Sequence, residues 1–580
     1  MFNNNSNTAC TNLKYIDLIG GSINGTLEYF ATGCGSLERI NANFIPGANN
    51  VSSAFSSCIK LKKPPTINLN DVVSAYGLFS GCSEITEFDY YINNNGSITN
   101  TQLMFQGCSK LKRFVSNQKF DFSQATNQSS CFYGCNSLIS APAITFGNGS
   151  AASFFYNCTS LVSVQSNINA NNISDIGGFF YNCSSLVDGP TVFDAANATN
   201  VNSLFEGCNR LETAPLVISF PKATTAIGLF RKCYSLNKAP TTITLPLATD
   251  IREMFKDCNR LVTPPNLIES NVAIYANSLF YNCSMLTKAP TTMTFPVAQD
   301  VSNTFCNCSS IINGPNRYYA PLATNANGFF TDCTLLQNAG TNFEIGNNNP
   351  GKCTFIDFFK NCTSLTTLPT EGDMNKGTNY SWFFYNTGAI AYESLQRFCG
   401  QGLTFPNANN ITHLFNTSKV IRVPSINGPN ITAATAMFQN TQQLESIGDI
   451  IIPSCYTIDL MFNNAGQSLL EIGKLNVTAM TTSNGSFNRL ANVRSLILIG
   501  LRTNFTLNNA RYLTSVKLEN PQANFIGDLS FQTCAMDSDA LDTLFNSLPD
   551  RADKSNTLTV NIKGNPGAQA CNRQIAIDKN

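Results

Sequence analysis

Hydrophobic residues recur along the chain at fixed positions of a repeat about 25 residues long. In the most regular part, a phenylalanine is followed three residues later by a cysteine, and three residues after that by a leucine or isoleucine. The phenylalanines and cysteines that define this ladder are Phe155, Cys158, Phe180, Cys183, Phe205, Cys208, Phe230, Cys233, Phe255, Cys258, Phe280 and Cys283. Repetition at this period is typical of solenoids, in which each repeat buries its apolar side by stacking on its neighbours.

Each repeat is predicted to contain a short helical turn followed by one or two short strands. The apolar positions around each phenylalanine are three or four residues apart, which is helical spacing, and Asp250 with Glu253 resembles a capping box. The next stretch, for example residues 235–247 (SLNKAPTTITLPL), is β-like, and its prolines limit ladder hydrogen bonding. We therefore predict an α/β solenoid of about 20 stacked rungs with terminal caps.

Differences between the repeats suggest a division of the chain into four regions. These are an N-terminal cap or first partial rung (1–25), regular cysteine-containing repeats (26–370), degenerate repeats that lack the ladder cysteine (371–524), and a C-terminal cap of helix, strand and helix (525–580). Two longer repeats carry extra residues around 344–352 and 393–402, which predict protruding loops.

The chain contains 22 cysteines, most of them in the ladder. Stacking would bring neighbouring Cα atoms to about 4.8 Å, but parallel Cα–Cβ bonds would keep the Cβ atoms beyond the roughly 3.5–4.5 Å that a disulfide needs. Buried thiols that pack as small hydrophobic groups are therefore favoured over a disulfide ladder. No cofactor or metal site is predicted, because Cys131 with Cys135 and Cys306 with Cys308 lack second pairs at zinc-binding spacing.

Charge and composition narrow the possible functions. The 36 basic and 36 acidic side chains cancel, so no binding to nucleic acid is expected. No apolar run approaches the roughly 18 residues of a membrane helix, so no membrane insertion is expected. Cysteine nucleophiles usually need a histidine partner, and His413 is the only histidine. Since the acidic residues also show no repeated register for a pair of facing carboxylates, we predict that the protein is not an enzyme.

Surface aromatic residues are the candidate binding residues. The position directly after the ladder phenylalanine holds Tyr133, Tyr156, Tyr181 and Tyr281, and in other repeats Glu206, Arg231, Lys256 and Thr331. The charged residues predict that this position faces solvent. A row of exposed tyrosines can stack on sugar rings or anchor a protein interface, although ordinary amphipathic surface tyrosines would give the same pattern.

The repeat motif resembles a known family. The pattern F-x-x-C-x-x-L with a downstream proline, as in LFEGCNRLETAP and MFKDCNRLVTPP, is similar to BspA-like leucine-rich repeats over roughly residues 10–515. Such repeats occur in bacterial and protist surface antigens, and similar ones occur in bacteriophage proteins. The resemblance implies a leucine-rich-repeat-like stack and a function in adhesion.

The leading hypothesis is a non-enzymatic adhesion or receptor-binding solenoid on the exterior of a bacteriophage particle, as a tail fibre, spike or head decoration. It follows from the repeat class, the low charge and the absence of a visible secretion signal, because virion proteins assemble in the host cytoplasm. The expected partners are a host-surface glycan or protein, other virion proteins and further copies of the chain. The alternatives are an architectural virion spacer or lattice protein, and a bacterial or protist adhesin at the cell surface.

Overall fold

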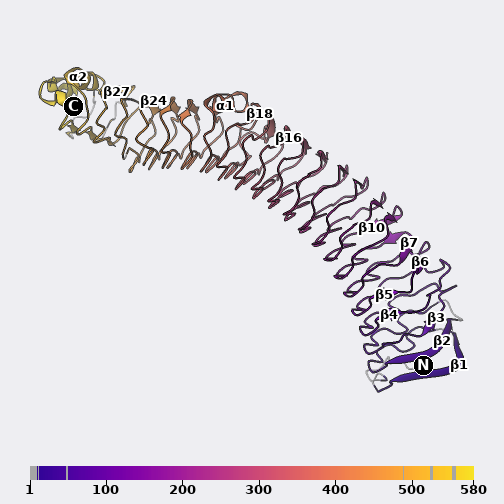
Figure 1. Ribbon diagram of the computed structural model, residues 1–580. Helices are drawn as coiled ribbons and strands as arrows, with labels where there is room; N and C mark the ends of the chain where they lie inside the picture. Colours follow the sequence, from indigo (N-terminus) through magenta and orange to yellow (C-terminus); the bar gives the residue numbers. More distant parts are fainter. Residues whose placement is uncertain are drawn as a thin grey trace. The chain divides into compact units, whose positions relative to one another are not determined.

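The chain forms two compact units, Met1–Leu286 and Thr287–Asn580, and each is a stack of parallel rungs (Figure 1). The computed structural model describes residues 10, 12–25, 27–46, 50–487, 489–522, 525, 527–550 and 557–579. From the predicted terminal caps, residues 1–9, 11, 526, 551–556 and 580 lie outside these described residues. The division into units falls within the regular repeats, so the four regions expected from the sequence stay predictions.

Short parallel strands build the first unit. They are β1 (Tyr15–Gly25), β2 (Arg39–Pro46), β3 (Thr66–Ile67), β4 (Glu87–Phe88), β5 (Arg113–Phe114), β6 (Lys119–Asp121), β7 (Ala143–Thr145), β8 (Gly149–Ser150), β9 (Asn167–Asn169), β10 (Ile173–Asp175), β11 (Val192–Asp194), β12 (Val217–Ser219), β13 (Thr242–Thr244) and β14 (Leu267–Glu269). The paired sets are β1-β2-β3, β4-β5, β6-β7, β8-β10, β9-β11 and β12-β13-β14. Partners lie one repeat apart, as Ile218 with Ile243 shows.

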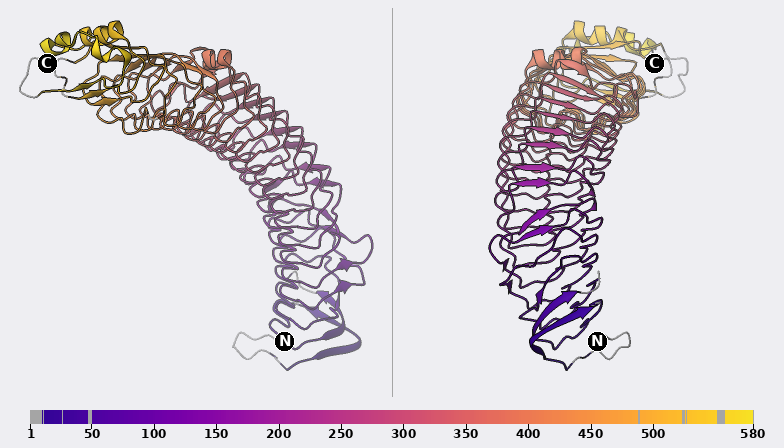
Figure 2. Two further views of the ribbon diagram at one scale, coloured as in Figure 1. Left: turned by 60° about the vertical axis from the view of Figure 1, so that its left-hand side comes forward. Right: turned by 90° about the vertical axis from the view of Figure 1, so that its right-hand side faces the viewer.

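The second unit adds helices to the strands. Its strands are β15 (Thr292–Thr294), β16 (Arg317–Ala320), β17 (Asn342–Ile345), β18 (Glu371–Asp373), β19 (Leu403–Thr404), β20 (Arg422–Val423), β21 (Ile426–Asn427), β22 (Ser446–Ile447), β23 (Ile450–Ile451), β24 (Glu471–Asn476), β25 (Ser495–Ile499), β26 (Phe505–Thr506), β27 (Ser515–Glu519), β28 (Leu529–Ser530) and β29 (Val560–Asn561). Its helices are α1 (Tyr392–Gln396), α2 (Ser538–Asn546) and α3 (Arg573–Lys579), with 3₁₀ turns at Phe398–Gly400 and Pro566–Gln569. The yellow helices near the C-terminus in Figure 2 include α2, which packs beside β27.

The predicted solenoid of about 20 turns is confirmed, but the segment before each ladder cysteine is not helical. It consists of consecutive turns in which alternate N–H groups bond to the next rung: Gly228 donates to Arg252 and Phe230 to Met254. An α-helix would use these N–H groups internally. The capping-box expectation is wrong for the same reason. Asp250 accepts from the N–H of Arg252, two residues on, and Glu253 has a φ of +60°, which does not occur within an α-helix.

The ladder side chains fill the core. Stacked phenylalanine rings run through the rungs, with centroids 5.4 Å apart for Phe230 and Phe255 and planes only 1° from parallel. The cysteines lie beside them as buried thiols that form no disulfide. Most of these thiols donate to the carbonyl of the ladder phenylalanine one rung back, as Cys258 Sγ does to Phe230 at 3.0 Å. Burial also raises the pKa of ladder thiols such as Cys108, whose pKa is raised to about 12.

The second long repeat does not form the expected protruding loop. Its extra residues fold into α1 and the 3₁₀ turn Phe398–Gly400. Phe398 is fully buried, with its ring centroid 6.0 Å from Phe383 and 6.1 Å from Phe384. The insertion therefore adds to the core.

Candidate binding strip

A strip of large side chains follows the ladder phenylalanines on successive rungs of the first unit. We define this strip as Tyr133, Tyr156, Tyr181, Glu206, Arg231, Lys256 and Tyr281. The backbone sets its register, because each carbonyl accepts from the preceding rung. Gly207 donates to Arg231 at 2.9 Å, and Asn182 donates to Glu206 at 2.7 Å. Residues at this position must therefore stack at the rung spacing.

The structure brings three of the predicted tyrosines together. The ring centroids are 4.8 Å apart for Tyr133 and Tyr156 and 4.3 Å apart for Tyr156 and Tyr181, and both pairs are 8° from parallel. Partial burial, with smaller effects of Tyr181 and Tyr133, raises the pKa of Tyr156 to about 12. Both faces of the Tyr156 ring are covered, so no sugar can stack on it. Ring edges and hydroxyls remain as its contact groups.

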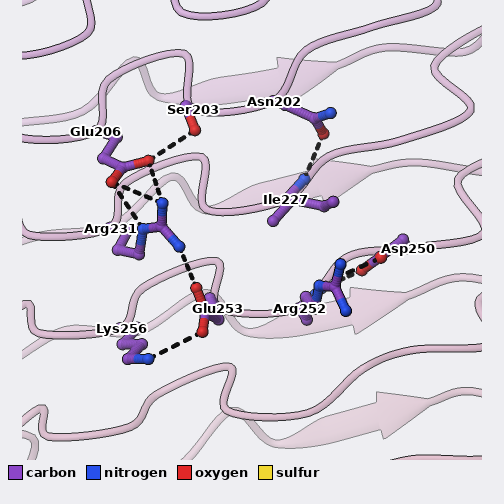
Figure 3. Close-up of polar contacts among 9 residues, drawn as sticks. All are labelled: Asn202, Ser203, Glu206, Ile227, Arg231, Asp250, Arg252, Glu253 and Lys256. Atoms are coloured by element: carbon purple, nitrogen blue, oxygen red, sulfur yellow. Dashed lines mark hydrogen bonds and ion pairs between the residues drawn. The ribbon is translucent and has the colours of Figure 1, made fainter.

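Tyr281 lies apart from the other three tyrosines, because Glu206, Arg231 and Lys256 occupy the strip positions between them. Figure 3 shows the chain of ion pairs in which these three residues take part. Glu206 starts this chain. The expectation of solvent exposure is wrong for Glu206, which is only 1% exposed, whereas the other residues of the strip are partly exposed. Its carboxylate accepts two hydrogen bonds from Arg231, both at 2.8 Å, and one from Ser203 Oγ at 2.6 Å. A bidentate pair of this kind offsets the cost of burying the charge.

The chain of ion pairs continues from Arg231 to Glu253 and Lys256. Arg231 also contacts Glu253, and Lys256 Nζ donates to Glu253 at 2.9 Å. Burial acts against the charge of Arg231, but hydrogen bonds to Glu206 and Glu253 outweigh it and raise the pKa of Arg231. Lys256 Nζ lies 5.4 Å from the centroid of the Tyr281 ring, a cation–π distance. The two carboxylates and two cations cancel, so this cluster carries no net charge.

Sequence reasoning missed Ser203 and Glu253, which lie two residues before a ladder phenylalanine. The spacing of these residues could have indicated their contacts, because Glu253 lies three residues before Lys256 and Ser203 lies three residues before Glu206. In a helix this spacing would also suggest contact. Here the backbone at Glu253 and Ser203 has positive φ, which turns their side chains onto the strip.

The second unit also carries large side chains at two positions of its repeat, directly after the ladder phenylalanine and two residues before it. The only tryptophan, Trp382, stacks on the only histidine, His413, with centroids 4.0 Å apart. Lys360 Nζ lies 5.3 Å from the Trp382 centroid, and the Tyr385 centroid is 4.8 Å away. Burial lowers the pKa of His413, and Asn416 lies 2.7 Å from its Nδ1 atom. Trp382 holds a φ of +62°, which is unusual for a bulky residue.

Other parts of the structure offer less for a chemical function. The described residues include no group of three or more histidine, cysteine, aspartate or glutamate side chains that could hold a metal ion. Within that same portion, no helix has both the length and the apolar character to cross a membrane. A cavity of about 600 Å³ near α3 is lined mostly by apolar side chains, among them Phe545, Leu548, Ile562 and Ile577.

Part of the chain matches a known sequence family. Residues 37–143 and 150–267 match the family described as "Mycoplasma protein of unknown function, DUF285". The match covers less than half of the chain and is not to the BspA-like class, so that finer assignment stays a prediction. No curated protein sequence is significantly similar to the chain.

Solved structures with a similar trace include two proteins that are described as leucine-rich. A leucine-rich repeat protein from Bacteroides ovatus is 16% identical with a TM-score of 0.33, over 79% of this chain and 88% of that one. A leucine-rich cell surface protein from Faecalibacterium prausnitzii is 15% identical with a TM-score of 0.25, over 51% and 78%. The Drosophila Toll–Spatzle complex gives 13% identity and a TM-score of 0.25, over 87% and 78%. Similarity this low says nothing about ligands.

Proposed function

We propose that the protein is a non-enzymatic binding solenoid that acts in adhesion or receptor binding through the strip. One observation carries this proposal. In the rungs that carry the strip, the ladder positions keep phenylalanine and cysteine because both fill the core, whereas the strip changes from stacked tyrosines to ion pairs and back to tyrosine. Stacking alone does not need this variety, but recognition of a specific partner does.

The chemistry of the strip favours a protein as the partner. Tyrosine and arginine are enriched at the energetic centres of protein interfaces, and the stacked rings offer edges and hydroxyls instead of faces. The pairing of Arg231 with Glu206 holds the guanidinium in place before binding, which lowers the entropic cost of association. Because the charges of Arg231 and Lys256 are balanced by Glu206 and Glu253, the strip suits a partner protein with a neutral surface better than an anionic polymer.

For the biological setting, we propose the exterior of a bacteriophage particle assembled in the host cytoplasm. The low charge and the repeat class support a binding protein, and they fit a cell-surface adhesin equally well. Cross-linking mass spectrometry on the native material that contains the protein separates the two settings. Capsid or tail proteins among the cross-linked partners support the virion, and cell-envelope proteins overturn it.

The same experiment tests the strip. Cross-links to the partner should concentrate at Lys232 and Lys256, next to or within the strip, and not at Lys238 on another side of the rung. The identified partner is then titrated against the variant Tyr156→Ala/Tyr181→Ala, which should bind it roughly tenfold or more weakly.

A matched control decides between binding and an architectural role. Tyr234 is 43% exposed and lies outside the strip, so Tyr234→Ala should leave the affinity unchanged. If the strip variant and the control bind the partner equally well, the strip is not the binding face. A protein for which no saturable partner is found would be a spacer or lattice element.

A further inference from the structure

The column of short strands is interrupted between β7 and β9. These strands belong to separate sheets, and among the described residues no backbone hydrogen bond joins them. The side-chain amide of Gln165 takes the place of the missing peptide group. Its Nε2 donates to the carbonyl of Ile144 at 3.2 Å, and its Oε1 accepts from the N–H of Ile144 at 3.0 Å.

A second interruption in the same unit shows what is missing here. Gln118 bridges to Ile92 in the same way, with both bonds at 3.0 Å. There a second amide closes the gap, because Asn94 donates to the carbonyl of Asp121 at 2.6 Å and accepts from its N–H at 3.1 Å. The residue that corresponds to Asn94 at the β7 interruption is Phe146, whose ring centroid lies 5.2 Å from that of Phe154. It supplies no second bridge, so the gap stays open.

The open gap forms a cleft of about 320 Å³ with an uncharged, amide-rich lining. The lining residues are Ile144, Thr145, Phe146, Gly147, Gln165, Asn167, Asn169, Asn171 and Asn172. Ser166 and Ala170 bond to the neighbouring strand β11. Because peptide groups alternate along a strand, those of Asn167 and Asn169 point toward the cleft. No backbone partner occupies them in the part of the chain that the structure describes.

We propose that this cleft binds one sugar ring of a neutral glycan. Each sugar hydroxyl both donates and accepts, which matches primary amides and open peptide groups. Phe146 and Ile144 supply an apolar wall for the C–H face of the ring. The volume is at the lower end of the roughly 300–1,000 Å³ of small-molecule sites, and Gln165 closes one end, so the cleft is too small for an inserted peptide strand.

The test is an array of neutral, sialylated and sulfated glycans probed with the full chain, followed by titration of the best neutral glycan. Saturable binding to neutral glycans is expected. The variant Asn167→Ala/Asn172→Ala removes two exposed amides without touching the core and should weaken binding roughly tenfold or more. Thr242→Ala, at the strand position equivalent to Asn167 in β13, should leave the affinity unchanged.

Hydrogen exchange gives a readout that does not depend on the variants. Addition of the neutral glycan should slow exchange of the Asn167 and Asn169 amides and leave those of Val217 and Ser219 in β12 unchanged. Absence of neutral-glycan binding, preference for anionic glycans or peptides, or equal affinity of the asparagine variant would each overturn the proposal. Loss of glycan binding in Tyr156→Ala/Tyr181→Ala, with the asparagine variant unaffected, would move the sugar site to the strip. The proposals for the cleft and for the strip are therefore tested independently of each other.

Discussion

The rungs with a ladder cysteine and the later rungs without one solve the same packing problem with different chemistry. In the cysteine rungs, Cys258 Sγ donates to the carbonyl of Phe230 at 3.0 Å. In a later rung the equivalent residue is Thr441, whose Oγ1 lies 3.1 Å from the carbonyl oxygen of Phe415 one rung back and 2.8 Å from that of Phe438 in its own rung. A hydroxyl thus replaces a thiol with the same phenylalanine carbonyl still within reach, which indicates that this position needs a small buried donor and not sulfur chemistry.

Other later rungs show that even this donor is dispensable. Ala465 occupies the position with no donor at all, and Ser418 Oγ is buried without a hydrogen-bond partner among the described residues. The phenylalanine rings still stack, with centroids 5.7 Å apart for Phe438 and Phe462 compared with 5.4 Å for Phe230 and Phe255. The phenylalanine column is therefore common to both regions, and the donor column is an addition to it.

The largest effect should come from breaking the shared column in each region. Phe255→Ala and Phe438→Ala both remove a fully buried ring, so each should cost roughly 3–5 kcal/mol of local stability. Because each rung contacts only its neighbours, hydrogen exchange should accelerate only in the adjacent rungs. A large loss in one region and none in the other would contradict the shared role of this column.

A smaller effect should come from removing the donor. Cys258→Ala and Thr441→Ala each delete one hydrogen bond and a little buried volume, so we expect a cost of about 1–2 kcal/mol in either region. Local hydrogen exchange and denaturant unfolding measure it, with Ala465→Gly as a control at a site that has no donor to lose. If Cys258→Ala costs as much as Phe255→Ala, the donor is not a secondary feature.

Much of this fold was predictable because the repeat itself carries the information. The period, the phenylalanine ladder and the buried thiols follow from residues such as Phe230 and Cys233 alone. The helical turn was predicted wrongly because a spacing of three residues between Phe, Cys and Leu suits a chain of turns as well as a helix. Small and polar residues two positions before and after the phenylalanine, such as Gly228 and Asn282, are the overlooked signal, because they tolerate the positive φ observed there.

The candidate sites were less predictable because they depend on contacts between rungs. Glu206 is charged, which indicates exposure, and only its pairing with Arg231 one repeat later allows its burial. Nothing in the sequence indicates that Gln165 replaces a peptide group, because a single glutamine in a polar stretch is usually an ordinary surface residue. The gap that Gln165 bridges arises from the spacing of the neighbouring strands β7 and β9, and this spacing cannot be inferred from the sequence of a single repeat.

Exchanging the donors between the two regions should have a still smaller effect. Cys258→Ser and Thr441→Cys each keep a small donor next to the same phenylalanine carbonyl, so each should change stability by less than about 1 kcal/mol. The comparison that matters is between Cys258→Ser and Cys258→Ala in the same rung, measured by denaturant unfolding. If serine is as costly as alanine, sulfur itself is required and the equivalence with Thr441 fails.

The smallest effect concerns acid, and the part of it that Glu253 contributes should appear only in the rungs that carry the ion pairs. Burial acts to raise the pKa of Glu253, but hydrogen bonds from Lys256 and Arg231 outweigh it and lower the pKa below the ordinary 4.5. A lowered carboxyl pKa stabilises the fold above pH 4.5, and this contribution disappears as the pH falls through the lower folded value. We expect a local loss below about 1 kcal/mol.

Asp250 should act in the opposite direction, since burial raises its pKa, so the variant Glu253→Gln is needed to isolate the effect of Glu253. Local hydrogen exchange between pH 6 and pH 3 should lose part of its acid dependence around Phe255 in this variant. The acid dependence of exchange around Phe438 should be the same with and without the substitution. There the positions directly after the ladder phenylalanines hold the uncharged Gln439 and Asn463. Equal acid sensitivity of both regions in the unmutated protein, or an acid dependence around Phe255 that Glu253→Gln leaves unchanged, would show that the ion pairs do not distinguish them.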